Sequence, residues 1–436
     1  MARLLIEGGH PVSGELLPLS SKNIALPLIA AALLSDEPVV LTGMPAISDV
    51  RVMLKLLEGL GGEYTISNYG EHVTVQGKGL EKWVVHDDLA EQIRGSNLIL
   101  APLLARFGKA QAYYPGGDKI GVRNMGAHFD VFRQLGYKVE EFPEESYFSI
   151  TKERDVTGNI DMYLYEASPT ATENAIILSS VRNGQTIITN AACEVHVRDL
   201  CVLLKSMGAD ISGMGTNRIV IQGIEKLHGT EHYLARDNIY ASSFIIFSLV
   251  TGGSLHIPHM PYADMLPILT VLKYFNVTWE ITPEGGIYIP STQDLRLNKN
   301  FNVYNNVGVF SDVWPKLPSD LLPLFAPLAS QSEGTFLLFE KMYAGRLKYL
   351  TELSHLGANL TLLDDHRLSI TGKTSLHAAM LQCPDIRSGV AYLAGMLAAG
   401  GNSILTDVYH IERTYPKIEA VLHALGANII RDEESF

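Results

Sequence analysis

The sequence predicts an α/β protein of two domains, each built from three similar units. At 436 residues the chain is too long for one ordinary core, so two domains of about 200 residues are expected. An amphipathic helix that ends at Gly or Asn and leads directly into a strand recurs six times, at intervals of roughly 70 residues. A glycine followed by a run rich in β-branched residues also recurs, and this pattern is typical of a strand.

The recurring helix carries apolar residues at i, i+3 and i+4, which form one buried stripe. The residue after its last turn accepts the left-handed conformation that ends a helix. The six copies end at Gly61, Gly136, Gly208, Asn276, Gly357 and Gly426. Glycine-ended helices occur in any α/β protein, but six at near-equal spacing indicate a repeat. Units of this length are too long for a solenoid, so three units per domain are expected.

The recurring strand segment alternates in polarity, as a half-buried strand does. Its copies lie at 184–190, 253–258, 334–339 and 401–407. Further apolar helices, expected at 24–34 and 389–399, complete each unit.

Composition excludes several classes of protein. Apolar residues make up 47% and charged residues 19%, the balance of a globular chain, and no apolar run reaches the roughly 18 residues of a membrane span. The first ten residues contain no secretory signal, and Cys193, Cys201 and Cys383 have neither metal-site nor disulfide spacing, so a reducing cytoplasm is expected. A net charge of −13 argues against a nucleic-acid partner, although a few converging arginines could still bind a small anion.

Two segments in the first half of the chain could carry chemistry. Lys22 and Asn23 directly precede an apolar helix, where free N–H groups and the helix dipole favour an anion. The alternative is a solvated lysine at a helix start. The segment 114–123 has three glycines within six positions and carries both Asp118 and Arg123, so it is either a mobile lid or a surface hairpin.

Two further features lie mostly in the second half. Asp320 follows two prolines and precedes an apolar helix, and capping of that helix is a complete structural explanation for it. Guanidinium groups bind carboxylate and phosphate with two hydrogen bonds, which suits an anionic substrate, although most arginines are solvated surface residues. The arginines of interest are Arg94, Arg346, Arg387 and Arg413.

Taken together, these segments resemble the enolpyruvyl transferase superfamily, and within it the branch that uses UDP-N-acetylglucosamine in peptidoglycan synthesis. The resemblance covers essentially the whole chain, and its specific pieces are 22–27, 115–123, 171–174, 190–194, 318–320, 385–389 and 409–413. It implies two similar domains, each of three βαβαββ repeats that form an inside-out α/β barrel. Residues 22–229 would form one domain with the mobile loop 115–123, residues 1–21 would join 230–436, and the active site would lie in the cleft between the domains.

The resemblance also implies a reaction. The enolpyruvyl (carboxyvinyl) group of phosphoenolpyruvate would move to the 3-hydroxyl of UDP-N-acetylglucosamine with release of phosphate, by addition and elimination, without metal or cofactor. This is the first committed step of peptidoglycan synthesis, a part of cell wall biogenesis. The implied catalytic residues are Lys22, Asp118, Asp320 and Arg413. The implied phosphoenolpyruvate-binding residues are Lys22, Arg123, Arg387 and Arg413. The implied contacts with the acceptor are Asn23, Arg94, Ser168, Asp320, Met342 and Arg346.

The sequence departs from the family pattern at three places. Asp118 replaces the loop cysteine of most members, so the covalent inhibitor fosfomycin, which needs a thiolate, is expected to be inactive; a carboxylic acid with a raised pKa can still donate a proton. The family continues after the loop arginine with Pro-x-Asp, which reads uracil, where this chain has 124–126 as Asn-Met-Gly. The segment 236–240 also departs from the usual Asp-Arg pattern.

These departures leave alternatives open. One is a paralogue that uses another nucleotide or nucleoside, such as UMP in nucleoside-antibiotic synthesis. Another is a catalytically dead paralogue that binds nucleotide, which the retained acids and bases argue against. A relative that uses shikimate 3-phosphate is disfavoured by the loop 115–123.

Overall fold

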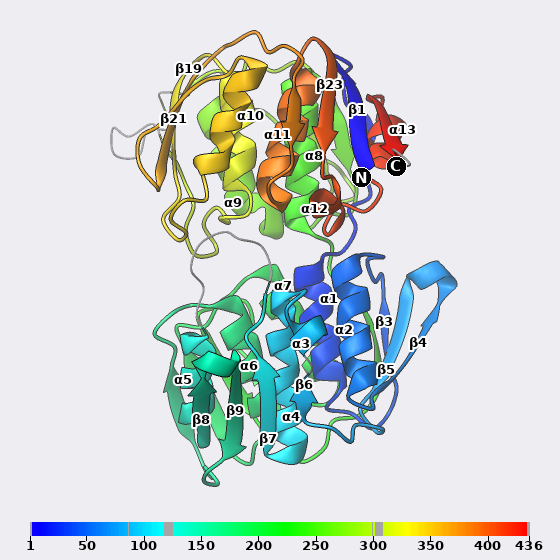
Figure 1. Ribbon diagram of the computed structural model, residues 1–436, viewed down its shortest axis with the longest axis vertical. Helices are drawn as coiled ribbons and strands as arrows, with labels where there is room; N and C mark the ends of the chain where they lie inside the picture. The colour runs from blue at the N-terminus through cyan, green and yellow to red at the C-terminus, as the bar shows by residue number, and fades with distance from the viewer. Residues whose placement is uncertain (1, 86, 117–124, 299, 301–307, 434–436) are drawn as a thin grey trace. The chain divides into compact units, whose positions relative to one another are not determined.

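The computed structural model describes residues 2–85, 87–116, 125–298, 300 and 308–433, which form two compact units (Figure 1). The first unit holds described residues from 20 to 235, and the second holds 2–19 and described residues from 236 onward. The domain boundaries expected from the sequence, 21/22 and 229/230, remain a prediction. The two divisions differ mainly at strand β14 (Thr230–Tyr233), which pairs with β3 (Val39–Thr42) of the first unit. No described helix is long and apolar enough to cross a membrane.

The described residues form six four-stranded sheets, which share one plan. In each, an edge strand runs parallel to the second strand, and the third and fourth strands run antiparallel to their neighbours. The sheets of the first unit have the orders β14-β3-β5-β4, β6-β7-β9-β8 and β10-β11-β13-β12. The sheets of the second unit have the orders β22-β23-β1-β24, β2-β15-β17-β16 and β18-β19-β21-β20. The predicted α/β architecture of six similar units, three in each half, is therefore confirmed.

The strands are short, as expected for sheets of this size. Those of the first unit, besides β3 and β14, are β4 (Glu63–Ser67), β5 (His72–Gln76), β6 (Val84–Val85), β7 (Lys109–Tyr113), β8 (Tyr137–Phe142), β9 (Tyr147–Lys152), β10 (Ile160–Tyr163), β11 (Gln185–Thr189), β12 (Asp210–Ser212) and β13 (Arg218–Gln222). Those of the second unit are β1 (Ala2–Gly8), β2 (Gly14–Glu15), β15 (Leu255–Ile257), β16 (Glu280–Ile281), β17 (Ile287–Ile289), β18 (Gly308–Phe310), β19 (Gly334–Phe339), β20 (Asn359–Leu362), β21 (Arg367–Gly372), β22 (Met380–Gln382), β23 (Gly401–Thr406) and β24 (Asn428–Glu433).

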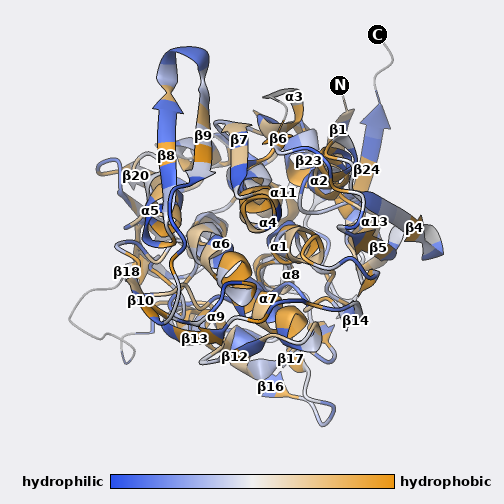
Figure 2. Cartoon of the chain, turned by 90° about the horizontal axis from the view of Figure 1, so that it is seen from below, coloured by the Kyte–Doolittle hydropathy of each residue, from blue (hydrophilic) through white to orange (hydrophobic). Residues whose placement is uncertain are grey.

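Buried helices contact one another inside each set of sheets. In the first unit these are α1 (Lys22–Ala32), α4 (Leu100–Phe107) and α6 (Pro169–Ser180). In the second unit they are α8 (Asn238–Thr251), α10 (Phe325–Ser330) and α11 (Ile386–Ala398). Most of their residues are buried, because a helix that is apolar on all sides is stable only when it is enclosed. In Figure 2 α1 and α4 are largely hydrophobic in colour, whereas β8 is largely hydrophilic.

The helices of the repeated phrase are amphipathic and half-buried. They are α2 (Ser48–Gly59), α5 (Gly126–Gln134), α7 (Val195–Ser206), α9 (Tyr262–Leu272), the 3₁₀-helix η7 (Lys348–Leu356) and α13 (Ile418–Ala424). The residues predicted to end them all have positive φ, between 59° at Asn276 and 106° at Gly208, which confirms the left-handed cap. The remaining short helices are α3 (Asp87–Ala90), α12 (Tyr409–Glu412), η1 (Asn68–Gly70), η2 (Arg94–Ile99), η3 (Pro143–Glu145), η4 (Lys273–Phe275) and η6 (Leu322–Leu324).

Candidate active site

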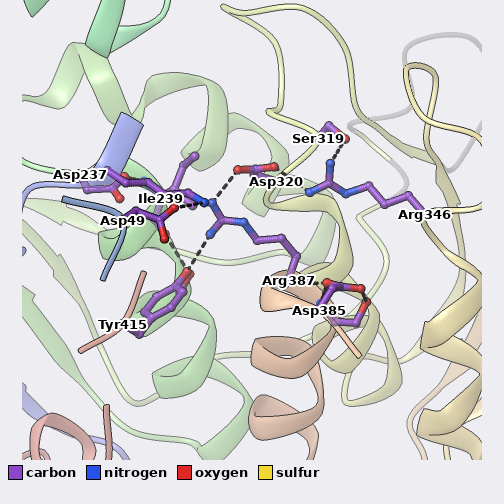
Figure 3. Close-up of polar contacts among 12 residues, drawn as sticks. Asp49, Asp237, Ile239, Ser319, Asp320, Arg346, Asp385, Arg387 and Tyr415 are labelled. Atoms are coloured by element: carbon purple, nitrogen blue, oxygen red, sulfur yellow. Dashed lines mark hydrogen bonds and ion pairs between the residues drawn. The ribbon is translucent and has the colours of Figure 1, made fainter. Parts of the chain in front are cut away.

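In the second unit, one carboxylate is bound by two buried arginines (Figure 3). The Oδ1 atom of Asp320 accepts a hydrogen bond from Arg346 Nη2 at 2.7 Å, and its Oδ2 atom accepts one from Arg387 Nη2 at 2.5 Å. Arg346 and Arg387 are only 4% and 6% exposed, whereas the Asp320 side chain is 29% exposed. The predicted capping role of Asp320 is wrong, because the residue before η6 is Leu321 and the carboxylate is bound by the two arginines instead.

Arg346 is held from behind by Ser319 and Glu340. Its Nη1 donates to Ser319 Oγ at 3.0 Å, and this hydroxyl donates to Glu340 Oε2 at 2.5 Å. Glu340 is fully buried, and its Oε1 accepts the backbone N–H groups of Met342 at 2.9 Å and Tyr343 at 3.2 Å. Glu340 was not singled out in the sequence. The signal that could have found it is an acidic residue directly after an apolar strand and shortly before a candidate arginine.

Arg387 lies in the first turn of α11, which Asp385 caps. The Oδ1 atom of Asp385 accepts the N–H groups of Arg387 at 2.8 Å and Ser388 at 2.9 Å, so the backbone of Arg387 is fixed. Burial alone would lower the pKa of the guanidinium, but the acidic groups of Asp320, Tyr415 and Asp237 outweigh it and raise the pKa. The arginine therefore remains charged in a buried position.

Two other predicted residues of this unit lie close in sequence to these groups. Arg413 is half-buried and follows α12, two residues before Tyr415, whose hydroxyl accepts from Arg387 Nη1 at 3.4 Å. Met342 is 39% exposed and follows Glu340 by two residues. The second unit thus brings Asp320, Arg346 and Arg387 into contact and places Arg413 and Met342 on adjoining segments.

In the first unit, Lys22 is the first residue of α1 and forms an ion pair. Its Nζ lies 3.3 Å from Asp49 Oδ2, and the two side chains are 17% and 4% exposed. The alternative of a freely solvated lysine is therefore wrong: an acid in the first turn of α2 holds the ammonium group. Asn23 is half-buried beside it in the helix.

Arg94 and Ser168 both lie near a buried histidine of α5. Arg94 begins η2, and Ser168 caps α6, with its Oγ accepting from Ala171 N at 3.5 Å. His128 is 2% exposed, and its Nε2 lies 3.1 Å from Thr170 Oγ1 near the start of α6. Burial, with the charge of Arg94 as a second cause, lowers the pKa of His128 to about 3.

The ring of His128 is further fixed by two amide groups. Asn97 Nδ2 lies 3.2 Å from Nε2, and Asn174 Nδ2 lies 3.0 Å from Nδ1. His128 was not singled out in the sequence, although it lies in the first turn of α5, the helix that follows the loop arginine. Asp118 and Arg123, predicted for catalysis and for binding, lie outside the described residues.

The described residues can perform acid–base chemistry on an anionic substrate. A carboxylate has about four acceptor sites, so Asp320 can accept a hydroxyl group while both arginines remain bound. The Asp320 cluster of the second unit therefore suits deprotonation of a hydroxyl group. In the first unit, Lys22 places a cation at the start of α1, where backbone N–H groups also favour an anion such as a phosphate or carboxylate.

The chain belongs to the EPSP synthase (3-phosphoshikimate 1-carboxyvinyltransferase) family, whose sequence model matches residues 6–422, and thus to the enolpyruvyl transferases. Over 432 residues it is 40% identical to UDP-N-acetylglucosamine 1-carboxyvinyltransferase of Treponema denticola, covering 98% of this chain and 99% of that protein. It is 37% identical over 430 residues to the protein of the same name from Borreliella burgdorferi, with the same coverage of both chains. The resemblance stated from the sequence is confirmed.

Solved structures show the same fold. The enolpyruvyl transferase NikO from Streptomyces tendae superposes with a TM-score of 0.85 at 24% identity, covering 99% of both chains. EPSP synthase from Acinetobacter baumannii gives a TM-score of 0.76 at 17% identity, covering 99% of this chain and 100% of that one. The predicted inside-out α/β fold is therefore the fold of this chain.

Proposed function

We propose that this protein transfers the enolpyruvyl group of phosphoenolpyruvate to the 3-hydroxyl of UDP-N-acetylglucosamine, releasing phosphate, in the cytoplasmic phase of peptidoglycan synthesis. The observation that carries the proposal is the Asp320 carboxylate bound by buried Arg346 and Arg387. Identity of 40% to a UDP-N-acetylglucosamine 1-carboxyvinyltransferase over almost the whole chain supports this acceptor.

The reaction proceeds in two steps. The acceptor hydroxyl loses its proton as its oxygen bonds to C2 of phosphoenolpyruvate, and C3 gains a proton, which gives a tetrahedral phospho-ketal. The bond from C2 to the phosphate oxygen then breaks, and C3 loses a proton, which restores the double bond as an enol ether. We assign the hydroxyl proton to Asp320, which is charged, partly exposed and oriented by two arginines.

The other predicted residues take binding roles in this proposal. Lys22, Arg123, Arg387 and Arg413 neutralise the phosphate and carboxylate of phosphoenolpyruvate, and Asp118 donates the proton to C3 or closes the loop. Asn23, Arg94, Ser168, Met342 and Arg346 contact the acceptor. Charge-assisted bonds of this kind contribute about 1.5–3 kcal/mol each, so Lys22→Ala and Arg413→Ala are expected nearly to abolish turnover.

A second acceptor is favoured by one specific observation. The sequence departs from the uracil-reading Pro-x-Asp pattern at 124–126 and from the family's usual Asp-Arg pattern at 236–240. Asp237 of the second segment caps α8, with its Oδ1 accepting from Ile239 N at 2.8 Å, so this position holds a buried acid in a local structural role. A different nucleotide or nucleoside, such as UMP, is the second candidate.

Phosphate release with phosphoenolpyruvate and one acceptor at a time tests the proposal. UDP-N-acetylglucosamine is expected to support release, whereas UMP, shikimate 3-phosphate and no acceptor are not. Lys55→Ala, which removes an exposed lysine on α2, is the control for Lys22→Ala. Release with UMP alone would favour the second candidate, and no release with any acceptor would refute the activity.

A further inference from the structure

The start of α6 is fastened to the segment that leads into α7, and both helices are labelled in Figure 1. Thr172 Oγ1 donates to the carbonyl oxygen of Ser168 at 2.8 Å and accepts from Ala192 N at 3.0 Å. Asn190 Nδ2 donates to the carbonyl oxygen of Leu164 at 2.7 Å. The position of Ser168 therefore depends on residues that directly precede α7.

A buried acid–imidazole pair also joins α6 to α7. Glu173 on α6 is 1% exposed, and its Oε1 lies 2.8 Å from Nδ1 of His196 in the first turn of α7. Burial raises the pKa of Glu173, and the hydrogen bond and charge of His196 act in the opposite direction. The cost of removing such a pair from water offsets most of its Coulomb attraction, so the pair adds little to the free energy of unfolding. Its role is therefore to fix one arrangement of α6 and α7.

We propose that Glu173 and His196 are positioning residues for the nucleotide-linked acceptor. They hold the first turn of α6 against α7, so that the Ser168 hydroxyl, at the positive end of the helix, meets a phosphate of the acceptor. Neither residue touches the substrate in this account: Glu173 is buried on α6, and His196 acts through its hydrogen bond to Glu173. The inference rests on the proposed function, in which Ser168 contacts the acceptor.

Steady-state kinetics with UDP-N-acetylglucosamine separate this role from catalysis. Glu173→Ala and His196→Ala are expected to raise the acceptor KM about tenfold, as expected for about 1.4 kcal/mol of lost binding. The KM for phosphoenolpyruvate and kcat should stay within about twofold. Glu173→Gln should restore most of the acceptor affinity, because the amide oxygen can still accept from Nδ1 of His196.

A second buried pair in the same unit provides the control. His232 Nε2 lies 3.1 Å from Asp199 Oδ1, and both residues are 8% exposed. His232→Ala should lower stability without changing the acceptor KM. If Glu173→Ala does not fold, His196→Ala carries the test, because His196 is 17% exposed and its truncation is better tolerated.

Three results would overturn the inference: an unchanged acceptor KM, an equal rise in both KM values, or an equal effect of His232→Ala. Failure of the proposed function would look different, because the unmodified protein would then release no phosphate with UDP-N-acetylglucosamine.

Discussion

At the scale of single residues, the site of the second unit depends on charge balance in a place with little water. Arg346 and Arg387 each give one Nη2 hydrogen bond to Asp320. Two buried cations would repel each other, and the shared carboxylate is what allows them to lie close together. A change at Asp320 is therefore expected to affect both folding and turnover.

Asp320→Asn tests this balance. The amide nitrogen cannot accept a hydrogen bond, so one guanidinium loses its partner, and the free energy of unfolding should fall by about 1–3 kcal/mol. Turnover should fall far more than stability, because an amide cannot take a proton. Urea unfolding and phosphate release measure the two effects.

The matched control is Asp312→Asn, since the Asp312 carboxylate pairs with Lys316 at 2.9 Å and Lys341 at 3.0 Å near the surface. Exposed pairs contribute about 0–1 kcal/mol, so this change should cost little and leave turnover intact. Full activity of Asp320→Asn would remove the residue from the proposed mechanism.

His128 should make the protein sensitive to acid. Its pKa is lowered to about 3 in the folded state, chiefly by burial, while an unfolded histidine titrates near 6.5. Between these values the unfolded state binds one more proton, so stability falls as pH falls, by at most about 1.4 kcal/mol per pH unit. Between pH 7 and pH 5, the free energy of unfolding should fall less for His128→Asn than for the unmodified protein. Urea unfolding at the two pH values measures this.

His355→Asn, at an exposed histidine, serves as the control for the acid test. It should follow the unmodified protein between pH 7 and pH 5. If His128→Asn and the unmodified protein lose the same stability over this interval, His128 is not the acid-sensitive group.

The sequence motifs singled out Asp320, Arg346 and Arg387, and the structure shows both arginines bound to the Asp320 carboxylate; their roles in catalysis and binding stay predictions. The motifs did not find Glu340 or His128. Their roles arise from burial and from partners far along the chain, such as Asn174, which lies 46 residues from His128. A single sequence shows neither burial nor such pairing at these positions.

At the scale of elements, the helix ends show how local signals act. Gly59 is the last residue of α2, has helical backbone, and an added Cβ would meet nothing within 4 Å. Gly61 follows with φ at 91°, and its Cβ would lie 2.6 Å from the carbonyl oxygen of Gly79. Two glycines only two positions apart therefore differ in whether they can accept a side chain.

Substituting alanine at these two glycines is expected to change the free energy of unfolding in opposite directions. Gly59→Ala should be neutral or stabilise by up to about 1 kcal/mol, because alanine is the better helix former. Gly61→Ala should destabilise by more than about 1 kcal/mol, because it combines a left-handed conformation with a backbone clash. Thermal unfolding of both variants checks this, and equal melting temperatures would contradict it.

Some features of the strands and helices could be predicted from local sequence, and others could not. The helix ends and the alternating strands were read from local sequence, and both were confirmed. Strand β14 beside β3, and β1 between β23 and β24, could not be read this way, because these pairs join segments far apart in the chain. Pairing between strands far apart in the sequence depends on how the whole domain packs around its core.

At the scale of the whole molecule, the same sheet-and-helix unit occurs six times, but the polar residue at the start of its inner helix differs from unit to unit. Each inner helix, or the short helix ahead of it, begins near a different polar residue. These residues are Lys22, Arg94, Ser168, Asp237, Asp320 and Arg387. Helix starts favour anions through their free N–H groups, so the repeat supplies a common electrostatic setting and the side chains supply specificity.

The last prediction concerns the nucleophiles of the whole chain: fosfomycin should not inactivate this protein. The drug's epoxide is opened by a thiolate on the family loop, where this chain has Asp118, and a carboxylate is a much weaker nucleophile. Burial raises the pKa of Cys201 to about 12 and also raises that of Cys193, so neither thiol ionises readily. Cys383 is 2% exposed, with its Sγ 3.2 Å from the carbonyl oxygen of Asp385.

Mass spectrometry after incubation with fosfomycin and substrate measures the adduct directly. The unmodified protein should gain no mass, whereas Asp118→Cys should become covalently labelled and lose activity with time. Asp118→Asn is the matched variant: its amide keeps the shape of the side chain but cannot release a proton, so turnover should fall sharply without any labelling. An adduct on the unmodified protein would contradict the prediction, and it would refute the assignment of Asp118 to the loop position.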